Sequence, residues 1–483
     1  MRDVDVLIVG GGISGLSTAW WLARQGVAVE LWECDSRPGG KIRTDQGNGY
    51  LTERAASLVM NFRPEVNQLM RESGLFVRKT PRAGAANRYL VQDGRLVPLP
   101  MKLGAMIASP LWSLRGKLRL LAEPFMPAGG HAQETVSEFI TRRLGREMLV
   151  KAMEPFIAGT LASDPDRANA YAVLPRLSAL ERRYGSLAVG VFVHKVLRRR
   201  TACPTESFSF QGGMSTLVEW LARTSGIEIR LGRQATELAM DRRGSWRITG
   251  SEPQGEHTLR ARQVVLSIPA KAAACLLDPL DPDLGRLLHG IDYAPLSVVH
   301  VGLPRAAIDH PLDGTGFLVP RQAGLVLSGC LWASALFPDR APAGKVLLSC
   351  YLGGARAPQA AGWNDTHSVA AVMQGLRPLL GINADPEMVR INRHPQALPL
   401  YHGAYQGRMQ ALDQRLELLP GLHLVADYRG GVSVRDRVTC GYTAAERILS
   451  VIGRPAPVVL NRPERLAADT LASARPAPTD TTA

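Results

Sequence analysis

The chain has 483 residues, of which 46% are hydrophobic, and its 57 lysines and arginines against 43 acidic residues give a formal net charge of +14. A chain of this length exceeds one simple core and predicts two or three domains, whose elements can be interleaved. The positive excess favours anionic lipid headgroups, polyanions or acidic substrates, but the basic residues are scattered and form no nucleic-acid-binding motif. Nucleic acid is therefore not the expected partner.

The cysteines and the hydropathy pattern exclude several other classes of protein. The six cysteines form no C-x-x-C pair and accompany no histidine cluster at zinc spacing, which predicts reduced thiols in an intracellular protein and no metal site. The N-terminus leads directly into a strand pattern, and no window reaches 18 uncharged apolar residues. We therefore expect neither a secretory signal nor a membrane-spanning helix. The expected location is the cytoplasm, and attachment to the inner face of a membrane is left open.

Residues 4–33 read as a strand, a glycine turn, a helix and a second strand. The glycines suit a tight turn, close approach of backbone to a pyrophosphate, and close helix-to-strand packing. The helix N-terminus supplies free N–H groups to the phosphates, and the acid that ends the second strand suits ribose hydroxyls. These residues are Gly10, Gly12, Ile13, Ser14, Gly15 and Glu33. Glycines that serve only the turn are the alternative, but the complete unit favours a dinucleotide site.

The rest of the chain alternates between helical and strand patterns. Residues 80–200 read mainly as helices with basic outer faces. An α/β pattern returns at 210–238, where a glycine turn opens a helix and a strand follows at 227–231. Further strands are predicted at 264–268 and within 295–353. The chain closes with a strand, a glycine-rich loop and a long helix over 421–452, followed by a tail rich in Pro, Ala and Thr that we expect to be disordered.

One segment, residues 101–127, mixes Leu, Met and Trp with Lys and Arg at helical spacings. Three roles stay open for it: lying on a membrane surface, lining a hydrophobic substrate channel, or packing on a core as an ordinary amphipathic helix. The pattern alone does not choose between them.

A second glycine motif and several longer segments carry a family resemblance. The motif is "RPGGKIRT", whose glycines let backbone reach a diphosphate and whose cations help to neutralise it. The longer segments include "NRYLVQDGRLVPLP", "EPFIAGTLASDPDRANAYAVLPRL", "SFSFQGGMSTLVEWLA", "LFPDRAPAGKVLLSCYLGGAR" and "ALPLYHGAYQGRM". Together they resemble the protoporphyrinogen IX oxidase family of the flavin-containing amine oxidase superfamily, over roughly residues 4–450.

The resemblance implies an α/β fold with three parts. These are a Rossmann-like FAD domain of the two-dinucleotide-binding type, an interleaved mixed-sheet substrate domain, and a helical domain for which membrane contact is left open. The expected boundaries are 1–78, 205–272 and 412–452 for the FAD domain, 79–98 and 273–411 for the substrate domain, and 99–204 for the helical domain. Residues 453–483 are the expected disordered tail.

The resemblance also implies FAD rather than NAD as the cofactor. The family pairs the N-terminal motif with a C-terminal segment, here 424–445, that reaches the isoalloxazine. Gly430 and Gly431 allow that approach, and the following helix start would offer N–H groups to the flavin pyrimidine oxygen. The residues expected to bind FAD are Gly10, Gly12, Ile13, Ser14, Gly15, Glu33, Gly39, Gly40, Lys41, Arg43, Ala235, Asp427, Val432 and Ser433.

The implied reaction oxidises a porphyrinogen to a porphyrin, and O2 reoxidises the flavin with release of hydrogen peroxide. Because the chemistry belongs to the cofactor, no catalytic residue is expected beyond the flavin. Arg88 matches the arginine that the family uses for a propionate, Leu318 and Tyr351 match positions that sandwich the macrocycle, and Gly159 matches a loop whose carbonyl faces the substrate. The alternatives are a surface arginine, plain core residues, and a helix-to-helix turn at Gly159.

Four places depart from the family pattern. Arg54 stands for a glycine after Glu53, Ala426 for a glycine before Asp427, Ala162 and Ser163 for a glycine pair, and Ser328 for a leucine over the macrocycle. Extra bulk would narrow the substrate pocket, and Ser328 would make it more polar. These changes put the substrate in question rather than the fold.

Three functions therefore compete. The first is oxidation of protoporphyrinogen IX or coproporphyrinogen III in tetrapyrrole biosynthesis. The second is a flavin oxidase or desaturase of the same fold that acts on another pyrrolic or apolar substrate, and the third is a non-catalytic relative that has lost FAD. The expected partner is a porphyrinogen or a related small molecule, while a membrane surface and a homodimer are left open.

Overall fold

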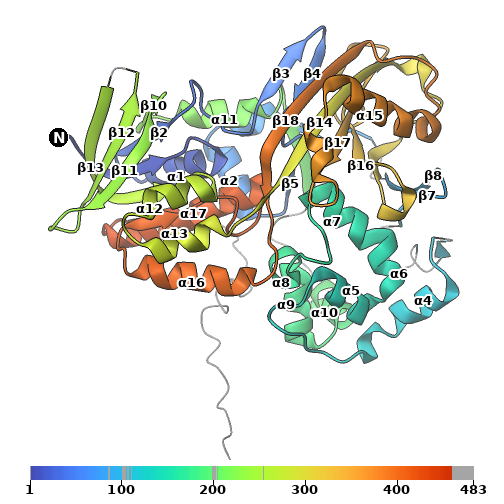
Figure 1. Ribbon diagram of the computed structural model, residues 1–483, viewed down its shortest axis with the longest axis horizontal. Helices are drawn as coiled ribbons and strands as arrows, with labels where there is room; N and C mark the ends of the chain where they lie inside the picture. The colour runs from blue at the N-terminus through green and yellow to red at the C-terminus, as the bar shows by residue number, and fades with distance from the viewer. Residues whose placement is uncertain are drawn as a thin grey trace, which may run out of the picture.

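The computed structural model describes residues 2–84, 87–100, 105, 108, 109, 111–197, 203, 205–253 and 255–458. Three regions are visible in Figure 1: a sheet covered by helices on the left, a second large sheet at the upper right, and a group of helices below the second sheet. One large cavity is lined by residues of all three regions.

The first sheet has the strand order β10-β2-β1-β13-β12-β11, and β19 pairs with the C-terminal end of β13. The strands are β1 (Arg2–Val9), β2 (Val29–Glu33), β10 (Ile227–Leu231), β11 (Gln234–Met240), β12 (Trp246–Glu252), β13 (Gly255–Leu266) and β19 (Leu422–Leu424). β11 and β12 pair antiparallel, whereas β1 is parallel to both of its neighbours. Val6, Leu7 and Ile8 are completely buried, as expected for a central strand covered on both faces.

Helices cover the two faces of this sheet. One face carries α1 (Ile13–Ala23), α2 (Pro64–Glu72), α11 (Ser215–Ala222) and α17 (Val434–Val451). The other face carries α12 (Ala270–Leu277), α13 (Pro282–His289) and α16 (Tyr405–Glu417). Ligands of such sheets bind at the carboxyl ends of the strands where the strand order reverses, which here is the end of β1.

The second sheet has the strand order β18-β14-β17-β16-β15-β7-β8, in which only β7 and β15 pair parallel. Its strands are β7 (Asn87–Gln92), β8 (Arg95–Pro98), β14 (Tyr293–Pro304), β15 (Gly314–Leu318), β16 (Leu327–Trp332), β17 (Lys345–Gly353) and β18 (Met388–Pro399). The helix α15 (Asp365–Leu380) packs on one face, and Val372 and Leu376 are buried against it. The opposite face supplies Val298, Leu318 and Tyr351 to the cavity wall.

Two small sheets join the regions. In the first, β3 (Thr44–Gly47) pairs with β4 (Tyr50–Glu53). In the second, β9 (Glu206–Phe210) lies between β5 (Val59–Asn61) and β6 (Lys79–Pro81). β9 therefore brings the chain, after the helical region, back beside β5 and β6, which precede that region in the sequence.

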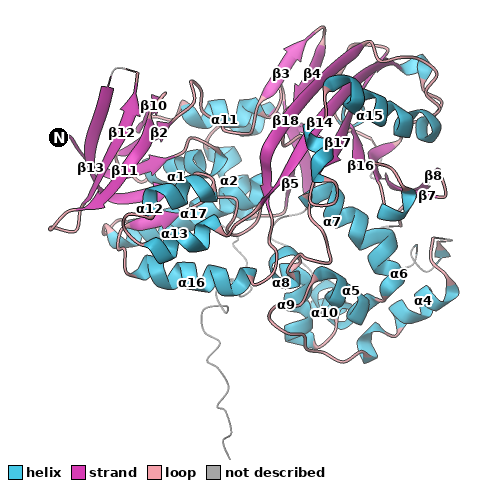
Figure 2. Ribbon diagram, viewed as in Figure 1, coloured by secondary structure: helices cyan, strands magenta, loops and turns pink. Residues whose placement is uncertain are grey.

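The helical region is coloured cyan in Figure 2, below the second sheet. Its helices are α4 (Leu114–Leu121), α5 (Val136–Leu144), α6 (Arg146–Met148), α7 (Glu154–Leu161), α8 (Ala170–Val173), α9 (Pro175–Tyr184) and α10 (Leu187–Leu197). The fully buried Arg143 forms an ion pair with Glu123, which also accepts hydrogen bonds from the Ser186 hydroxyl and the Leu187 amide. This buried pair fixes α5 against the start of α10, and removing either partner would leave a buried charge alone.

The predicted strand–turn–helix–strand unit, the strand at 227–231 and the closing strand, loop and helix are all present. The helices predicted from residue 80 are wrong for residues 80–84 and 87–98. There the chain forms the end of β6, which pairs with β9, and the hairpin of β7 and β8, which turns at Asp93 and Gly94. Most of residues 101–110 and the tail from 459 lie outside the described residues. Within the part of the chain that is described, no helix has the length and apolarity to cross a membrane.

Candidate functional site

The cavity has a volume of about 3480 Å³, several times the roughly 300–1,000 Å³ of a single small-molecule pocket. Its lining residues come from the end of β1, from both large sheets and from the helical region. A cavity of this size has room for a dinucleotide and a second ligand.

The glycine turn after β1 forms one end of the cavity. A Cβ at Gly10, which has φ +104°, would collide with the Ser267 backbone, and a Cβ at Gly15 would collide with the carbonyl oxygen of Gly10. These two glycines are required by the fold. Gly12 differs, because its φ of −69° suits any residue and a Cβ there would have no atom within 4 Å. The space above Gly12, which we call the cradle, belongs to the cavity. Only a bound ligand would require glycine at this position.

The first turn of α1 and the end of β2 complete this part of the site. No side chain caps the N-terminus of α1, so its N–H groups are free to bind phosphate oxygens. The Glu33 carboxylate is buried and accepts hydrogen bonds from the amides of Gly11 (2.7 Å) and Asp35 (2.9 Å). These bonds hold it on the cavity wall, beside Ala235 of β11, where it can accept a ribose hydroxyl.

The second glycine motif lies against the first. Gly39 forms a bridge with Gly12, and Arg37 braces the turn by donating to the carbonyls of Pro38 and Gly40. The Lys41 ammonium donates to the Ala397 carbonyl (2.7 Å) and lies 3.4 Å from the Asp427 carboxylate. Arg43 lines the cavity and faces Asp45 at 3.4 Å.

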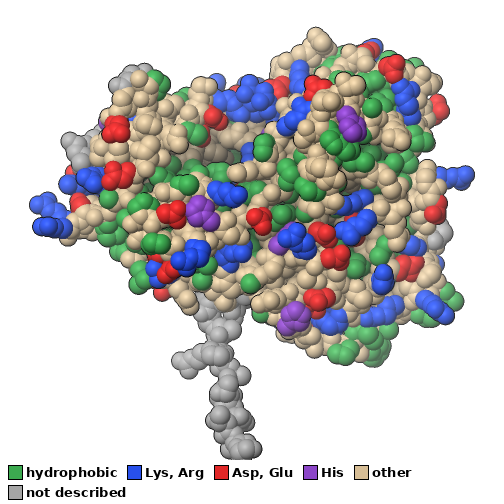
Figure 3. Space-filling model, in the orientation of Figure 1, with side chains coloured by type: hydrophobic (Ala, Val, Ile, Leu, Met, Phe, Trp, Pro, Cys, Tyr) green, Lys and Arg blue, Asp and Glu red, His purple; other side chains and the backbone are tan. Residues whose placement is uncertain are grey.

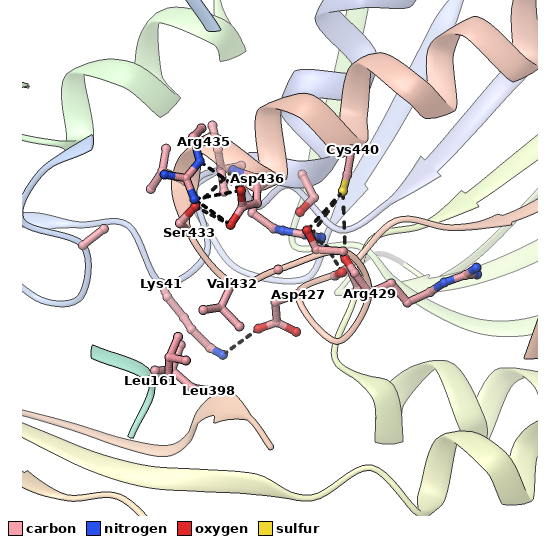
Figure 4. Close-up of a pocket in the computed structure, with 18 of the residues that line it drawn as sticks. Lys41, Leu161, Leu398, Asp427, Arg429, Val432, Ser433, Arg435, Asp436 and Cys440 are labelled. Atoms are coloured by element: carbon pink, nitrogen blue, oxygen red, sulfur yellow. Dashed lines mark hydrogen bonds and ion pairs between the residues drawn. The ribbon is translucent and has the colours of Figure 1, made fainter. Parts of the chain in front are cut away.

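The C-terminal segment faces Lys41 across the cavity, as Figure 4 shows. Asp427 accepts the hydroxyl of Tyr293 at its carboxylate (3.1 Å) and the hydroxyl of Tyr401 at its backbone carbonyl (2.5 Å). The Ser433 hydroxyl caps α17 by accepting from the Asp436 amide. Val432 and Ser433 therefore stand on the wall at the positive end of a helix dipole.

Sequence reasoning missed the residues that hold this segment. The buried guanidinium of Arg437 donates to the carbonyls of Ala426 and Arg429 and thereby fixes the loop between β19 and α17. Tyr293 and Tyr401 orient Asp427 from other parts of the chain. A buried arginine on an otherwise apolar helix face was the one available signal.

The residues expected to contact the substrate come from the second sheet and from α7. Arg88, Gly159, Leu318 and Tyr351 all line the cavity. The loop or turn expected at Gly159 is wrong, because this residue lies inside α7, where a Cβ would collide with Leu318. Glycine here lets the helix lie directly on β15.

The four departures from the family pattern have separate outcomes. The Arg54 guanidinium is held by both oxygens of Asp45 (2.7 and 3.0 Å). Ser328 is buried behind the wall with its hydroxyl directed at the Tyr351 carbonyl, so the expected polar substrate contact is not formed by this side chain. Ser163 bonds to His402 and, like Ser328, does not line the cavity, whereas Arg54, Ala162 and Ala426 do line it.

Glu53, which precedes Arg54, is buried beneath the site. It accepts hydrogen bonds from the Thr44 hydroxyl and the Met214 amide and lies 3.6 Å from Arg340. Burial raises the pKa of Glu53 to about 7 against the opposing effect of these partners. Its role is to join β3, β4 and α11.

Arg88 reaches the cavity from β7, and within the described ranges it has no negative partner. The pKa of its guanidinium is lowered by burial and by the nearby Arg82, and among the described residues no carboxylate forms an ion pair with it. The cavity that Arg88 enters is also lined by apolar side chains, among them Phe156, Leu161, Leu318 and Leu398. An unpaired, half-buried arginine in such a wall is suited to a carboxylate on an apolar ligand.

These observations fit the FAD that the family resemblance implies. The cradle above Gly12, the free N–H groups of α1 and the held carboxylate of Glu33 suit the adenosine diphosphate half. Lys41, Asp427 and the start of α17 add further polar groups to the cavity wall, and they would hold the flavin half of the cofactor.

Comparisons with known proteins agree with this geometry. The sequence profile of the flavin containing amine oxidoreductases matches residues 13–449. Protoporphyrinogen oxidase 2 of Arabidopsis thaliana is 30% identical over 92% of this chain and 94% of the plant protein, and coproporphyrinogen III oxidase of Bacillus subtilis is 27% identical over 92% and 98%. A crystal structure from Exiguobacterium sp. 255-15, described as a candidate protoporphyrinogen oxidase, has the same fold, with a TM-score of 0.76 at 24% identity over 92% of this chain and 98% of that one.

We predict that Gly12→Val removes the flavin without unfolding the protein. The added side chain has space in the protein but occupies the cradle, so FAD retention should fall by about ten-fold or more, measured by flavin absorbance after purification. The control is Gly407→Val in α16, an exposed glycine that also has no neighbour within 4 Å of a Cβ. A Gly12→Val protein with full flavin content would contradict the assignment of the cradle.

Proposed function

The chain belongs to the flavin-containing amine oxidoreductases, and from that membership we propose that it oxidises a porphyrinogen to a porphyrin with O2 as the electron acceptor. The family defines an oxidoreductase that uses a flavin, and the cavity accommodates it as FAD. The relatives named above act, by name, on protoporphyrinogen and coproporphyrinogen. Both are apolar macrocycles that carry carboxylates.

One observation carries the proposal for the substrate: the unpaired Arg88 in an apolar wall of the same cavity as the dinucleotide cradle. A ligand that satisfies both features has a large apolar body and at least one carboxylate. The departures at residues 54, 163 and 328 have their side chains engaged by other residues, which weakens the case for a different substrate.

The roles of the protein residues follow from their positions. When bound, FAD supplies the chemistry by accepting hydride equivalents from the substrate. Arg88 fixes the substrate through a carboxylate, and Leu318 and Tyr351 contact the macrocycle and exclude water. The N–H groups at Val432 and Ser433 favour negative charge on the cofactor side of the cavity, while Asp427, held by Tyr293, binds a polar group of the cofactor chain. No side chain is required as a nucleophile.

The test of the function is an anaerobic titration of the purified flavoprotein with a porphyrinogen. We expect the flavin absorbance to bleach and porphyrin fluorescence to grow, and readmitted air should restore the flavin with consumption of O2 at an oxygen electrode. A flavin-loaded protein that protoporphyrinogen IX and coproporphyrinogen III both leave unbleached would refute the proposed substrate class. Bleaching without recovery in air would refute only the acceptor.

The role of Arg88 is tested by Arg88→Ala. Loss of a charge-assisted hydrogen bond should raise KM for the porphyrinogen by about ten-fold to a hundred-fold and leave the flavin spectrum unchanged, with partial recovery in Arg88→Lys. The control is Arg95→Ala on the neighbouring strand β8, which removes an exposed charge that does not line the cavity. Equal effects of the two variants, or loss of flavin in Arg88→Ala, would show that Arg88 does not bind the substrate.

A membrane surface is the further partner that we propose. Leu114, Leu118, Leu121 and Phe125, here called the α4 patch, are each more than half exposed and lie beside Arg115 and Lys117. Figure 3 shows hydrophobic and basic side chains gathered at the lower right of the molecule, over the helical region. Apolar side chains flanked by cations suit the boundary of an anionic bilayer.

We expect the protein to float with vesicles that contain anionic lipid, and Leu118→Asp with Leu121→Asp to reduce the bound fraction several-fold because burial of two leucines is lost. The control is Leu418→Asp, which alters an equally exposed leucine beyond α16. If the double variant binds vesicles as the wild type does, the α4 patch is not the contact. A dimer in size-exclusion chromatography that the same double variant converts to a monomer would assign the patch to self-association instead.

A further inference from the structure

Three arginines converge on one aromatic ring at the seam between the first sheet's region and the helices. The guanidinium carbon of Arg176 lies 3.4 Å from the centre of the Phe62 ring, that of Arg435 lies 4.0 Å away, and that of Arg63 lies 5.9 Å away. Phe62 and Arg63 follow β5, Arg176 begins α9 and Arg435 begins α17. We call Arg63, Arg176 and Arg435 the arginine cluster.

The cluster has more positive charge than its surroundings neutralise. Arg435 is engaged, since it donates to the Asp436 carboxylate (3.0 and 3.2 Å) and to the Met60 carbonyl (2.8 Å). Asp436 in turn accepts from the Ser433 hydroxyl. In the described part of the chain, Arg63 and Arg176 form no ion pair, and their guanidinium groups donate no hydrogen bond to a side chain or carbonyl.

The electrostatic state of Arg176 agrees with this imbalance. Burial, followed by the charges of Arg63 and Arg435, lowers the pKa of Arg176 to about 10, and Asp436 is the acid that opposes the shift. Arg176 stays protonated at neutral pH, so the three charges coexist with one carboxylate. A cation-π contact that only joined the two regions would need a single arginine on Phe62. Two further arginines would weaken such a contact, because the like charges repel each other.

The cluster faces the same cavity as the proposed FAD and substrate sites. Phe62, Arg63, Arg176 and Arg435 all line it. Figure 4 shows Arg435 beside Ser433, next to Val432, on the side of the loop away from Asp427. Arg63 and Arg176 are exposed, which places them where the cavity meets solvent. Arg88 comes from β7 of the second sheet, so the cluster and Arg88 reach the cavity from different parts of the fold.

We propose that Arg63 and Arg176 form a second carboxylate-binding site that makes the enzyme favour porphyrinogens with four carboxylates, such as coproporphyrinogen III, over those with two. This inference rests on the proposed function. Two planar guanidinium groups with free N–H donors suit carboxylates, and the Phe62 ring beneath them limits their hydration. Arg88 would bind one edge of the macrocycle, and the cluster would bind carboxylates that extend toward solvent.

The experiment compares kcat/KM for coproporphyrinogen III and protoporphyrinogen IX in the wild type, in Arg63→Gln with Arg176→Gln, and in a control. The control is Arg71→Gln in α2, which removes an exposed charge that does not line the cavity. We expect the wild type to have the higher kcat/KM for coproporphyrinogen III. In the double variant this preference should fall by about ten-fold or more, because KM for coproporphyrinogen III rises. The flavin content and kcat on protoporphyrinogen IX should be retained. Arg71→Gln should retain the preference.

A binding measurement separates failure of this inference from failure of the proposed function. Fluorescence titration with coproporphyrin III and protoporphyrin IX reports affinity without turnover. Wild-type protein that binds neither porphyrin and oxidises neither porphyrinogen refutes the proposed function, and the inference with it. Wild-type protein that binds and oxidises both, with a preference that Arg63→Gln and Arg176→Gln leave unchanged, refutes the carboxylate site alone. Loss of flavin in the double variant would assign the cluster to cofactor binding and overturn the inference as well.

Discussion

The structure depends on one close crossing of backbone, where α1 leaves the end of β1. Gly10 and Gly15 permit this contact, because a Cβ at either position would collide with backbone. The crossing sets the free N-terminus of α1 over the carboxyl end of a central strand whose Val6, Leu7 and Ile8 are completely buried. The cradle above Gly12, the position of Glu33 and the contact with the second glycine motif at Gly39 all follow from it.

The other half of the site is assembled from distant parts of the chain. The loop between β19 and α17 has no regular structure of its own, and it is held by the buried Arg437 and by the hydroxyls of Tyr293 and Tyr401. Tyr293 begins β14 and Tyr401 follows β18, so the second sheet positions the last part of the cofactor site. Cofactor and substrate regions are therefore coupled mechanically as well as by the cavity they share.

The arginines of the cavity that have no acidic partner among the described residues are the features that link this fold to a substrate with carboxylates. Among the described residues, the half-buried Arg88 has no ion-pair partner, and neither have Arg63 and Arg176, which lie exposed beside Phe62 and line the same cavity. By contrast, the completely buried Arg143 forms an ion pair with the buried Glu123. The contrast indicates that the cavity arginines await anionic groups from a ligand.

The sequence alone determined the dinucleotide unit, because the strand, the glycines, the helix and Glu33 are contiguous and each has a local physical reason. It also predicted Arg88, Leu318 and Tyr351 for the second ligand, through family resemblance, and the structure brings them to one cavity. Contacts between residues far apart in the chain decide three other features: Gly159 lies inside a helix, the Ser328 hydroxyl is directed away from the cavity, and Arg437 holds the loop before α17. Likewise, Arg63, Arg176 and Arg435 look like ordinary surface charges in the sequence. Only the packing of α9 and α17 around Phe62 makes them one site, since no local pattern encodes which distant charges meet.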